Sequence, residues 1–110
     1  MFRQELEEYL KEYLNHLSAT LTPQTISKHS RIIGYCIEYI DLYHSVKGFE
    51  DITLSMISSK LYGNYQSHFM ENISRPSMLK IIKKYFEYIY ETYGIGNKQL
   101  LNKLKNPSRR

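Results

Sequence analysis

The sequence predicts an all-α fold, a four-helix bundle-like domain with a short fifth helix near the C-terminus. Apolar residues recur at spacings of three and four along most of the chain, and no segment alternates apolar and polar residues over a useful length. Proline, glycine and hydroxyl residues stand where helices of ordinary length would begin and end. The chain has 110 residues, which suits one such domain and leaves no room for a second.

The first two predicted helices share a short connection. Leucines and tyrosines at helical spacing indicate a helix over 3–17, and the glutamates in its first turns suit the positive end of a helix dipole. Thr22 followed by Pro23 is a hydroxyl N-cap with proline at the first helical position. A second helix is therefore expected from there to about residue 44, with Ile26, Ile33, Ile37 and Ile40 forming its apolar face.

The remaining helices follow from similar signals. Thr53 is the expected N-cap of a third helix, whose buried face is Leu54, Ile57, Leu61, Tyr65 and Phe69, and Phe49 is expected to enter the core from the preceding loop. A fourth helix over 75–93 is expected to be capped by Ser74 or Ser77 and to stop at Gly94, with Met78, Ile82, Tyr85, Ile89 and Tyr93 facing inward. A short fifth helix over 98–104 places Leu100, Leu101 and Leu104 on one side.

Composition narrows the class of protein. No stretch approaches the roughly 20 apolar residues of a membrane span, and glutamates follow the N-terminus at once, which argues against a secretory signal. A single cysteine, Cys36, can form no internal disulfide, so a reducing, cytoplasmic setting is expected. No membrane partner is expected, because no stretch is apolar enough to span a bilayer. Cys36 lies among apolar residues, where a buried thiol is expected.

Charge is distributed unevenly along the chain. The net charge is +4, yet residues 1–74 hold six Lys/Arg against nine Asp/Glu, and residues 75–110 hold nine against two. Two of the predicted helices have basic or hydroxyl residues in their N-terminal halves and acidic residues further along. The basic and hydroxyl positions are Thr25, Lys28 and Arg31 on the second helix and Ser77, Lys80, Lys83 and Lys84 on the fourth. A helix with its side chains fits the DNA major groove, so this pattern favours a polyanion site on one flank of the bundle, with a plain solvated face as the alternative.

The sequence contains no recognisable arrangement of catalytic or metal-binding residues. No two histidines lie three or four residues apart, the glycines are scattered, and no serine has a histidine and an acid arranged around it. We therefore expect no catalytic residue, no metal site and no cofactor on this chain. The tyrosines are interpreted as the aromatic filler of the core, with base stacking as a minor alternative.

Several of these segments resemble a known family. The run Leu21-Thr22-Pro23-Gln24-Thr25-Ile26, followed by His29, Ile33, Cys36, Tyr39 and Ile40, is similar to the second helix of the core-binding domain of tyrosine recombinases, which include phage integrases. Phe49 to Thr53 resembles the connection before the third helix, and 74–95 resembles the fourth helix and its exit. The similarity covers roughly residues 4–95. The tail departs from the family, because Asn106-Pro107 comes later than the usual Asn-Pro segment.

The resemblance implies a domain that forms half of a clamp around recombination-site DNA. Residues 1–96 would be the DNA-binding domain and 97–110 a short helix with the start of a linker. The implied partners are double-stranded DNA, a catalytic domain of the same full-length protein, and other recombinase protomers. The family's chemistry belongs to that second domain, so this chain is expected to be part of a recombinase without being an enzyme itself, either as an excised domain or as a natural fragment.

Two other functions stay open at this point. A helical protein–protein interaction module could dock a partner on an exposed Leu100, Leu101 and Leu104 surface. A standalone excision or regulatory factor could bind DNA without any catalytic half.

Overall fold

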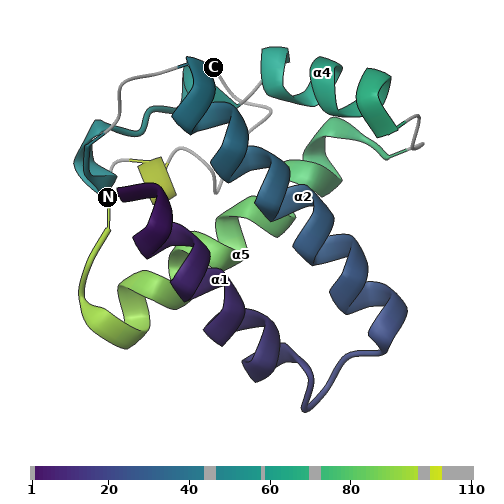
Figure 1. The fold of residues 1–110 in the computed structure, drawn as a ribbon, viewed down its shortest axis with the longest axis vertical. Coiled ribbons are helices and arrows are strands. Elements are labelled where there is room, and N and C mark those ends of the chain that lie inside the picture. The colour runs from purple at the N-terminus through teal and green to yellow at the C-terminus, as the bar shows by residue number, and fades with distance from the viewer. Residues whose placement is uncertain (1, 44–46, 58, 70–72, 97–99, 103–110) are drawn as a thin grey trace.

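Two long antiparallel helices, α1 (Phe2–Leu17) and α2 (Pro23–Tyr43), form a hairpin on one side of the fold (Figure 1). This computed structural model describes residues 2–43, 47–57, 59–69, 73–96 and 100–102. The hairpin turn is held by the backbone, since the N–H groups of Thr20 and Leu21 both donate to the carbonyl of Leu17 at 3.0 Å. The Thr22 hydroxyl accepts from the Thr25 N–H at 3.3 Å, so Thr22 is the N-cap of α2 as predicted.

The segment after the hairpin is built from short elements. A 3₁₀ turn, η1 (Phe49–Asp51), leads to α3 (Leu54–Ile57) and α4 (Ser59–Phe69). The single helix predicted here corresponds to these two elements on either side of Ser58, which lies outside the described residues. Phe49 is buried and packs edge-on against Phe2 and Phe86, with ring centroids 5.0 and 6.1 Å away, which confirms its predicted place in the core.

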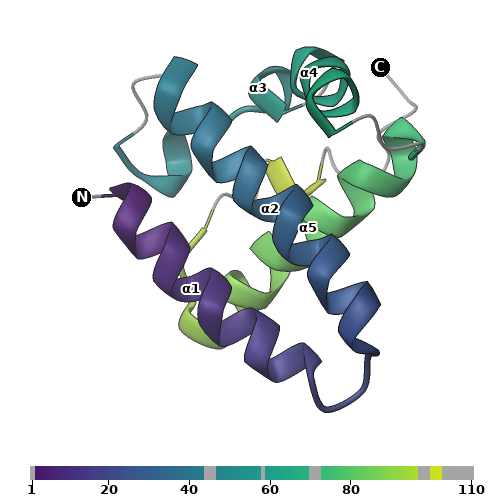
Figure 2. The same ribbon diagram turned by 45° about the vertical axis from the view of Figure 1, so that its right-hand side comes forward.

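The last long helix, α5 (Arg75–Tyr93), crosses the hairpin (Figures 1 and 2). Ser74 is its N-cap, because its hydroxyl accepts from the Ser77 N–H at 3.3 Å. Gly94 ends the helix with φ +69°, a left-handed conformation that glycine adopts without the steric cost of a Cβ. Both ends therefore fall where the sequence predicts them.

The hairpin, α4 and α5 enclose one hydrophobic core. Ile32, Ile57, Leu61, Tyr65, Met78, Ile82 and Ile89 are completely buried in it. The hydroxyl of buried Tyr85 on α5 donates to the Leu6 carbonyl of α1 at 2.5 Å, which satisfies the one polar atom of that ring. The predicted all-α fold is confirmed, since the part of the chain that is described consists of helices and their connections without a strand.

Some predicted exposures are wrong. Leu100 and Leu101, expected to form an exposed apolar surface, are only 3% and 7% exposed, because residues 100–102 are helical and pack into the same core. Leu104 and positions 97–99 and 103–110 of that prediction lie outside the described residues. Conversely, Phe69 and Tyr93 are expected inside but are 37% and 42% exposed, because each lies in the last turn of its helix, beyond the elements that cover the core.

None of the described helices combines the length and apolar character that crossing a bilayer requires.

Candidate nucleic-acid interface

Both helices that carry the predicted site residues begin with two hydroxyl residues three positions apart. The Thr22 and Thr25 hydroxyls are 3.0 Å apart at the start of α2, and the Ser74 hydroxyl donates to the Ser77 hydroxyl at 2.9 Å at the start of α5. Thr25 and Ser77 are thus held by the helix caps. Each hydroxyl can still use its remaining lone pairs or proton toward a ligand, since a hydroxyl has one donor and two acceptor positions.

The N-terminal halves of α2 and α5 lie on the same flank of the molecule. The two helices cross and pack together, and in both ribbon views their first turns lie to the right of the crossing, those of α2 below it and those of α5 above it (Figures 1 and 2). The positive ends of two helix dipoles therefore belong to one side of the protein, where they favour negative charge. We call this side the α2–α5 flank, defined by residues 25–31 and 77–84.

His29 lies where the two helices meet on this flank. Its ring is half-buried, and the pKa of His29 is lowered from its usual value first by that burial, then by the positive charges of Lys84 and Lys28. Lys84 belongs to α5 and Lys28 to α2, so cations from both helices act on one imidazole. Positive charges from two helices that act on one group favour the binding of an anion nearby.

The exposed lysines of α5 are available for such an anion. Lys80 and Lys84 are exposed one turn apart on the same face, and the exposed Ser77 lies nearly one turn before Lys80. Lys28, Lys80 and Lys84 form no ion pair with any carboxylate in the described ranges.

Two of the predicted residues are held by other groups. Arg31 Nε donates to the hydroxyl of Tyr65 on α4 at 3.3 Å, so its half-buried side chain bridges α2 and α4. Lys83 Nζ lies 3.6 Å from the Glu87 carboxylate one turn along α5, and both side chains are partly buried. The structure therefore places Lys28 and Lys84 within electrostatic reach of the same imidazole, whereas Arg31 and Lys83 have partners of their own.

Acidic residues gather away from the α2–α5 flank. The sequence has no Asp or Glu between Tyr13 and Ile37 and none between Ile73 and Phe86. At the other end of the hairpin, Arg3 of α1 binds Glu7 at 3.1 Å and Asp41 of α2 at 3.2 Å. The antiparallel hairpin places the start of α1 beside the end of α2, so the acidic ends of both helices fall together.

Two residues on the basic side of the fold do not stand out in the sequence. His29 reads there as a packing residue, and Arg75 only as a charge at the foot of α5. His29 Nδ1 and Arg75 Nε are both buried without a hydrogen-bond partner among the described residues. The spacing of His29 from Ile32 and Ile33 is the signal that could identify it, because it places the imidazole at the inner edge of α2, where it meets α5.

Within the described ranges, no three His, Cys, Asp or Glu side chains come together as a group that could hold a metal ion. Cys36 is buried, and burial raises the pKa of its thiol to about 12, so the thiolate is not formed at neutral pH. No protein-family model, curated protein or solved structure matches the chain.

Proposed function

We propose that this chain binds duplex DNA through the α2–α5 flank, as the core-binding module of a site-specific tyrosine recombinase. The observation that carries DNA binding is that α2 and α5 pack together with exposed Lys80 and Lys84 on α5, and that Lys84 and Lys28 of α2 both act electrostatically on His29. Cations from two crossing helices can contact phosphates at separate places along one duplex, which fixes the orientation of the protein on it.

The electrostatics of the flank favour a polyanion over a neutral partner. Lys80 and Lys84 are like charges one turn apart, which is slightly destabilising unless an anion lies nearby. The helix N-termini add to the same field, and the segments that form the flank contain no carboxylate. Binding of phosphates there would release condensed counterions, which is the main source of non-specific DNA affinity.

The residues divide into two roles in this proposal. Lys28, Lys80 and Lys84 contact phosphates and position the duplex. Thr25 and Ser77, held at the first turns of their helices, are the candidates for contacts with base edges in the major groove. Arg31 and Lys83 join only if they exchange Tyr65 and Glu87 for phosphate.

The recombinase part of the proposal is supported by the resemblance. The Leu21-Thr22-Pro23 segment leads into α2, with Thr22 as its N-cap. The helices α1, α2 and α5 occur in the order that the family pattern requires. In this proposal the attack on the scissile phosphate belongs to a separate catalytic domain, and this chain holds the site for it beside other protomers. Codons after Arg110 that encode His-x-x-Arg and a later tyrosine would support this part. A stop codon there would contradict the recombinase part of the proposal, while the proposal of DNA binding would be unaffected.

A salt titration tests DNA binding through the flank. We expect Lys80→Ala with Lys84→Ala to weaken binding of a duplex and to lower the slope of log K against log salt by about 0.9 for each phosphate that is no longer neutralised. The matched control is Lys11→Ala with Lys47→Ala, which removes the same charge from exposed positions outside the flank and should leave the slope nearly unchanged. Equal slopes for the two double variants would contradict the proposed interface.

The interaction-module alternative has no such support. Leu100 and Leu101, the docking surface predicted for it, are buried in the core of the chain itself.

A further inference from the structure

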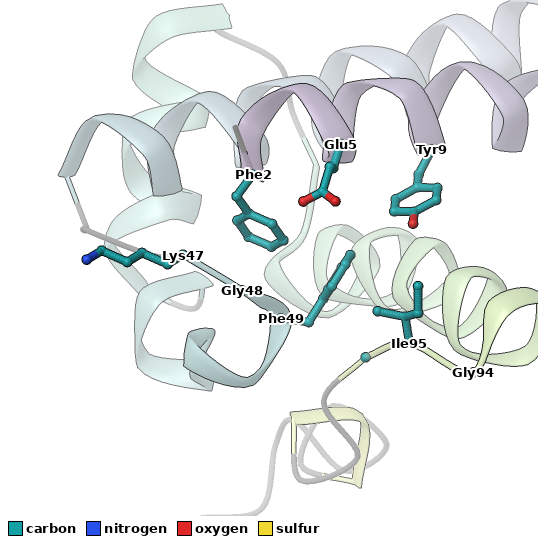
Figure 3. A pocket seen from close by; sticks show the side chains of 9 residues that line it. Phe2, Glu5, Tyr9, Lys47, Gly48, Phe49, Gly94 and Ile95 are labelled. Atoms are coloured by element: carbon teal, nitrogen blue, oxygen red, sulfur yellow. The ribbon is translucent and has the colours of Figure 1, made fainter.

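A cleft of about 420 Å³ lies at the start of α1, away from the lysines of the α2–α5 flank. It is bounded by the first turns of α1, the approach to η1, and the segment that follows α5 (Figure 3). Phe2, Tyr9 and Ile95 supply most of its apolar surface, with the buried Phe49 adding little, and the Glu5 side chain extends into it between Phe2 and Tyr9. The cleft thus combines aromatic walls with a single carboxylate.

The aromatic walls are held in place by packing. The Phe2 and Phe49 rings meet edge-on with centroids 5.0 Å apart, and Tyr9 lies 6.2 Å from Phe49 and 5.1 Å from Tyr93. Ile95 remains 40% exposed at the rim. Lys47 contributes to the lining, but its side chain extends away from Glu5 (Figure 3), so it does not neutralise that carboxylate.

The carboxylates of α1 differ in their partners. Glu7 is paired with Arg3, and Glu12 accepts hydrogen bonds from the Tyr88 and Tyr93 hydroxyls. Glu5 and Glu8 have no hydrogen bond or ion pair with any residue that the structure describes. These two line a second hollow of about 390 Å³ with Gln4 and Tyr9, so the free carboxylates of α1 border adjoining depressions.

We propose that this cleft binds an arginine side chain presented by a segment of a protein partner. A guanidinium stacks on aromatic faces and forms two parallel hydrogen bonds to one carboxylate, so it matches both the ring walls and Glu5. The compact, strongly hydrated ammonium of lysine uses the carboxylate but gains less from the rings. Nucleic acid is the wrong occupant, because Glu5 and Glu8 repel phosphates. The arginine site and the α2–α5 flank are separate surfaces, so occupation of one leaves the other accessible.

The test uses capped pentapeptides with glycine at every position except the central one, which holds arginine, citrulline or lysine. Citrulline keeps the shape of arginine and removes its charge. Backbone amide shifts of the full chain would be followed during titration. We expect saturable shifts at Glu5, Phe49 and Ile95 with the arginine peptide and about tenfold weaker binding of the citrulline peptide.

Two variants of the chain complete the test. Glu5→Gln changes an exposed side chain, so the fold should persist, and we expect it to weaken the arginine peptide at least about tenfold. Glu38→Gln removes an exposed carboxylate of α2 and should bind as the wild type does. Equal affinity of the arginine and citrulline peptides, or unchanged binding by Glu5→Gln, would overturn the assignment. Cleft shifts that depend on protein concentration without peptide would overturn it too, because the occupant would then be a second copy of the chain.

Discussion

The positive charge of Lys84 on α5 lowers the pKa of His29 on α2, together with Lys28 on the same helix as the imidazole. Burial of the ring is the larger cause, and the two lysines add to it. This relationship joins the two helices that carry the proposed interface, and the His29 imidazole can report on it because its pKa responds to charges on both helices.

Removing Lys84 should raise the pKa of His29. In Lys84→Ala one of the two neighbouring charges is gone while the burial remains, so the shift should be partial and upward toward the usual value near 6.5. An NMR pH titration of the His29 ring proton measures it. Lys60→Ala, at an exposed position on α4, is the matched control and should leave the pKa of His29 unchanged. An unchanged pKa of His29 in Lys84→Ala would show that Lys84 on α5 does not act on the imidazole of α2.

DNA affinity should rise as the pH falls below about 6.5, if the proposed interface is correct. Phosphates beside Lys28 and Lys84 offset their charge, so the pKa of His29 is higher in the complex than in the free chain. The complex then binds more protons than the free protein between the two pKa values, and acid favours association. Titrations with duplex DNA at pH 5.5 and pH 8, at constant salt, should show this difference in the wild type. His29→Gln should remove most of it, whereas His16→Gln on the exposed face of α1 should retain it.

The free chain should show the opposite pH dependence at His29. Because the folded-state pKa of His29 is depressed, the unfolded chain binds more protons there, and the free energy of unfolding declines as the pH falls from about 6.5 through the folded pKa. A steeper loss of stability in the wild type than in His29→Gln over this window, by urea unfolding, is the expected result. Parallel curves would mean that His29 titrates alike in both states.

The stabilisation of the fold by Glu12 should be lost both at acid pH and at strongly alkaline pH. Hydrogen bonds from the Tyr88 and Tyr93 hydroxyls lower the pKa of Glu12, so its contribution is complete above the unfolded value near 4.5 and is lost as the pH falls through the folded pKa. The same bonds raise the pKa of Tyr88 and raise that of Tyr93 to about 12, so the contribution also fails as the pH rises through that value.

The matched variants for this contribution are Glu12→Gln and Glu91→Gln. Glu12→Gln keeps an oxygen acceptor and removes the charge, so its stability should fall below that of the wild type at pH 7 and approach it at pH 3. Glu91→Gln, an exposed carboxylate on α5, serves as the control and should differ little at either pH. A deficit of Glu12→Gln that persists at pH 3 would show that the carboxylate charge is not its cause.

Two glycines should respond to alanine in opposite directions. Gly94 has φ +69°, where a Cβ is strained, so Gly94→Ala should lower the free energy of unfolding by about 1 kcal/mol. Gly63 lies inside α4, and a Cβ there would meet nothing within 4 Å, so Gly63→Ala should raise it by about 0.5–1 kcal/mol. Chemical denaturation of both variants checks the pair. A stabilising Gly94→Ala would contradict the left-handed stop of α5.

The long helices, their ends and the segregation of charge were all predictable from the sequence. Thr22, Ser74 and Gly94 act on backbone groups within a few residues, so their roles depend on local chemistry alone. The inward faces of α1 and α5 likewise follow from apolar spacing, as the burial of Leu6, Ile82 and Ile89 confirms.

Which neighbour each side chain meets was decided by the tertiary structure. Leu100 and Leu101 carry the same apolar signal whether they are exposed or buried, and only the packing of 100–102 into the core distinguishes the two. Arg31 and Lys28 both read as basic positions of α2, yet Arg31 meets Tyr65 of α4, whereas Lys28 acts with Lys84 of α5 on His29. Periodicity defines a face of one helix. It carries no information about the helix that lies against that face, because such contacts join residues far apart in the chain.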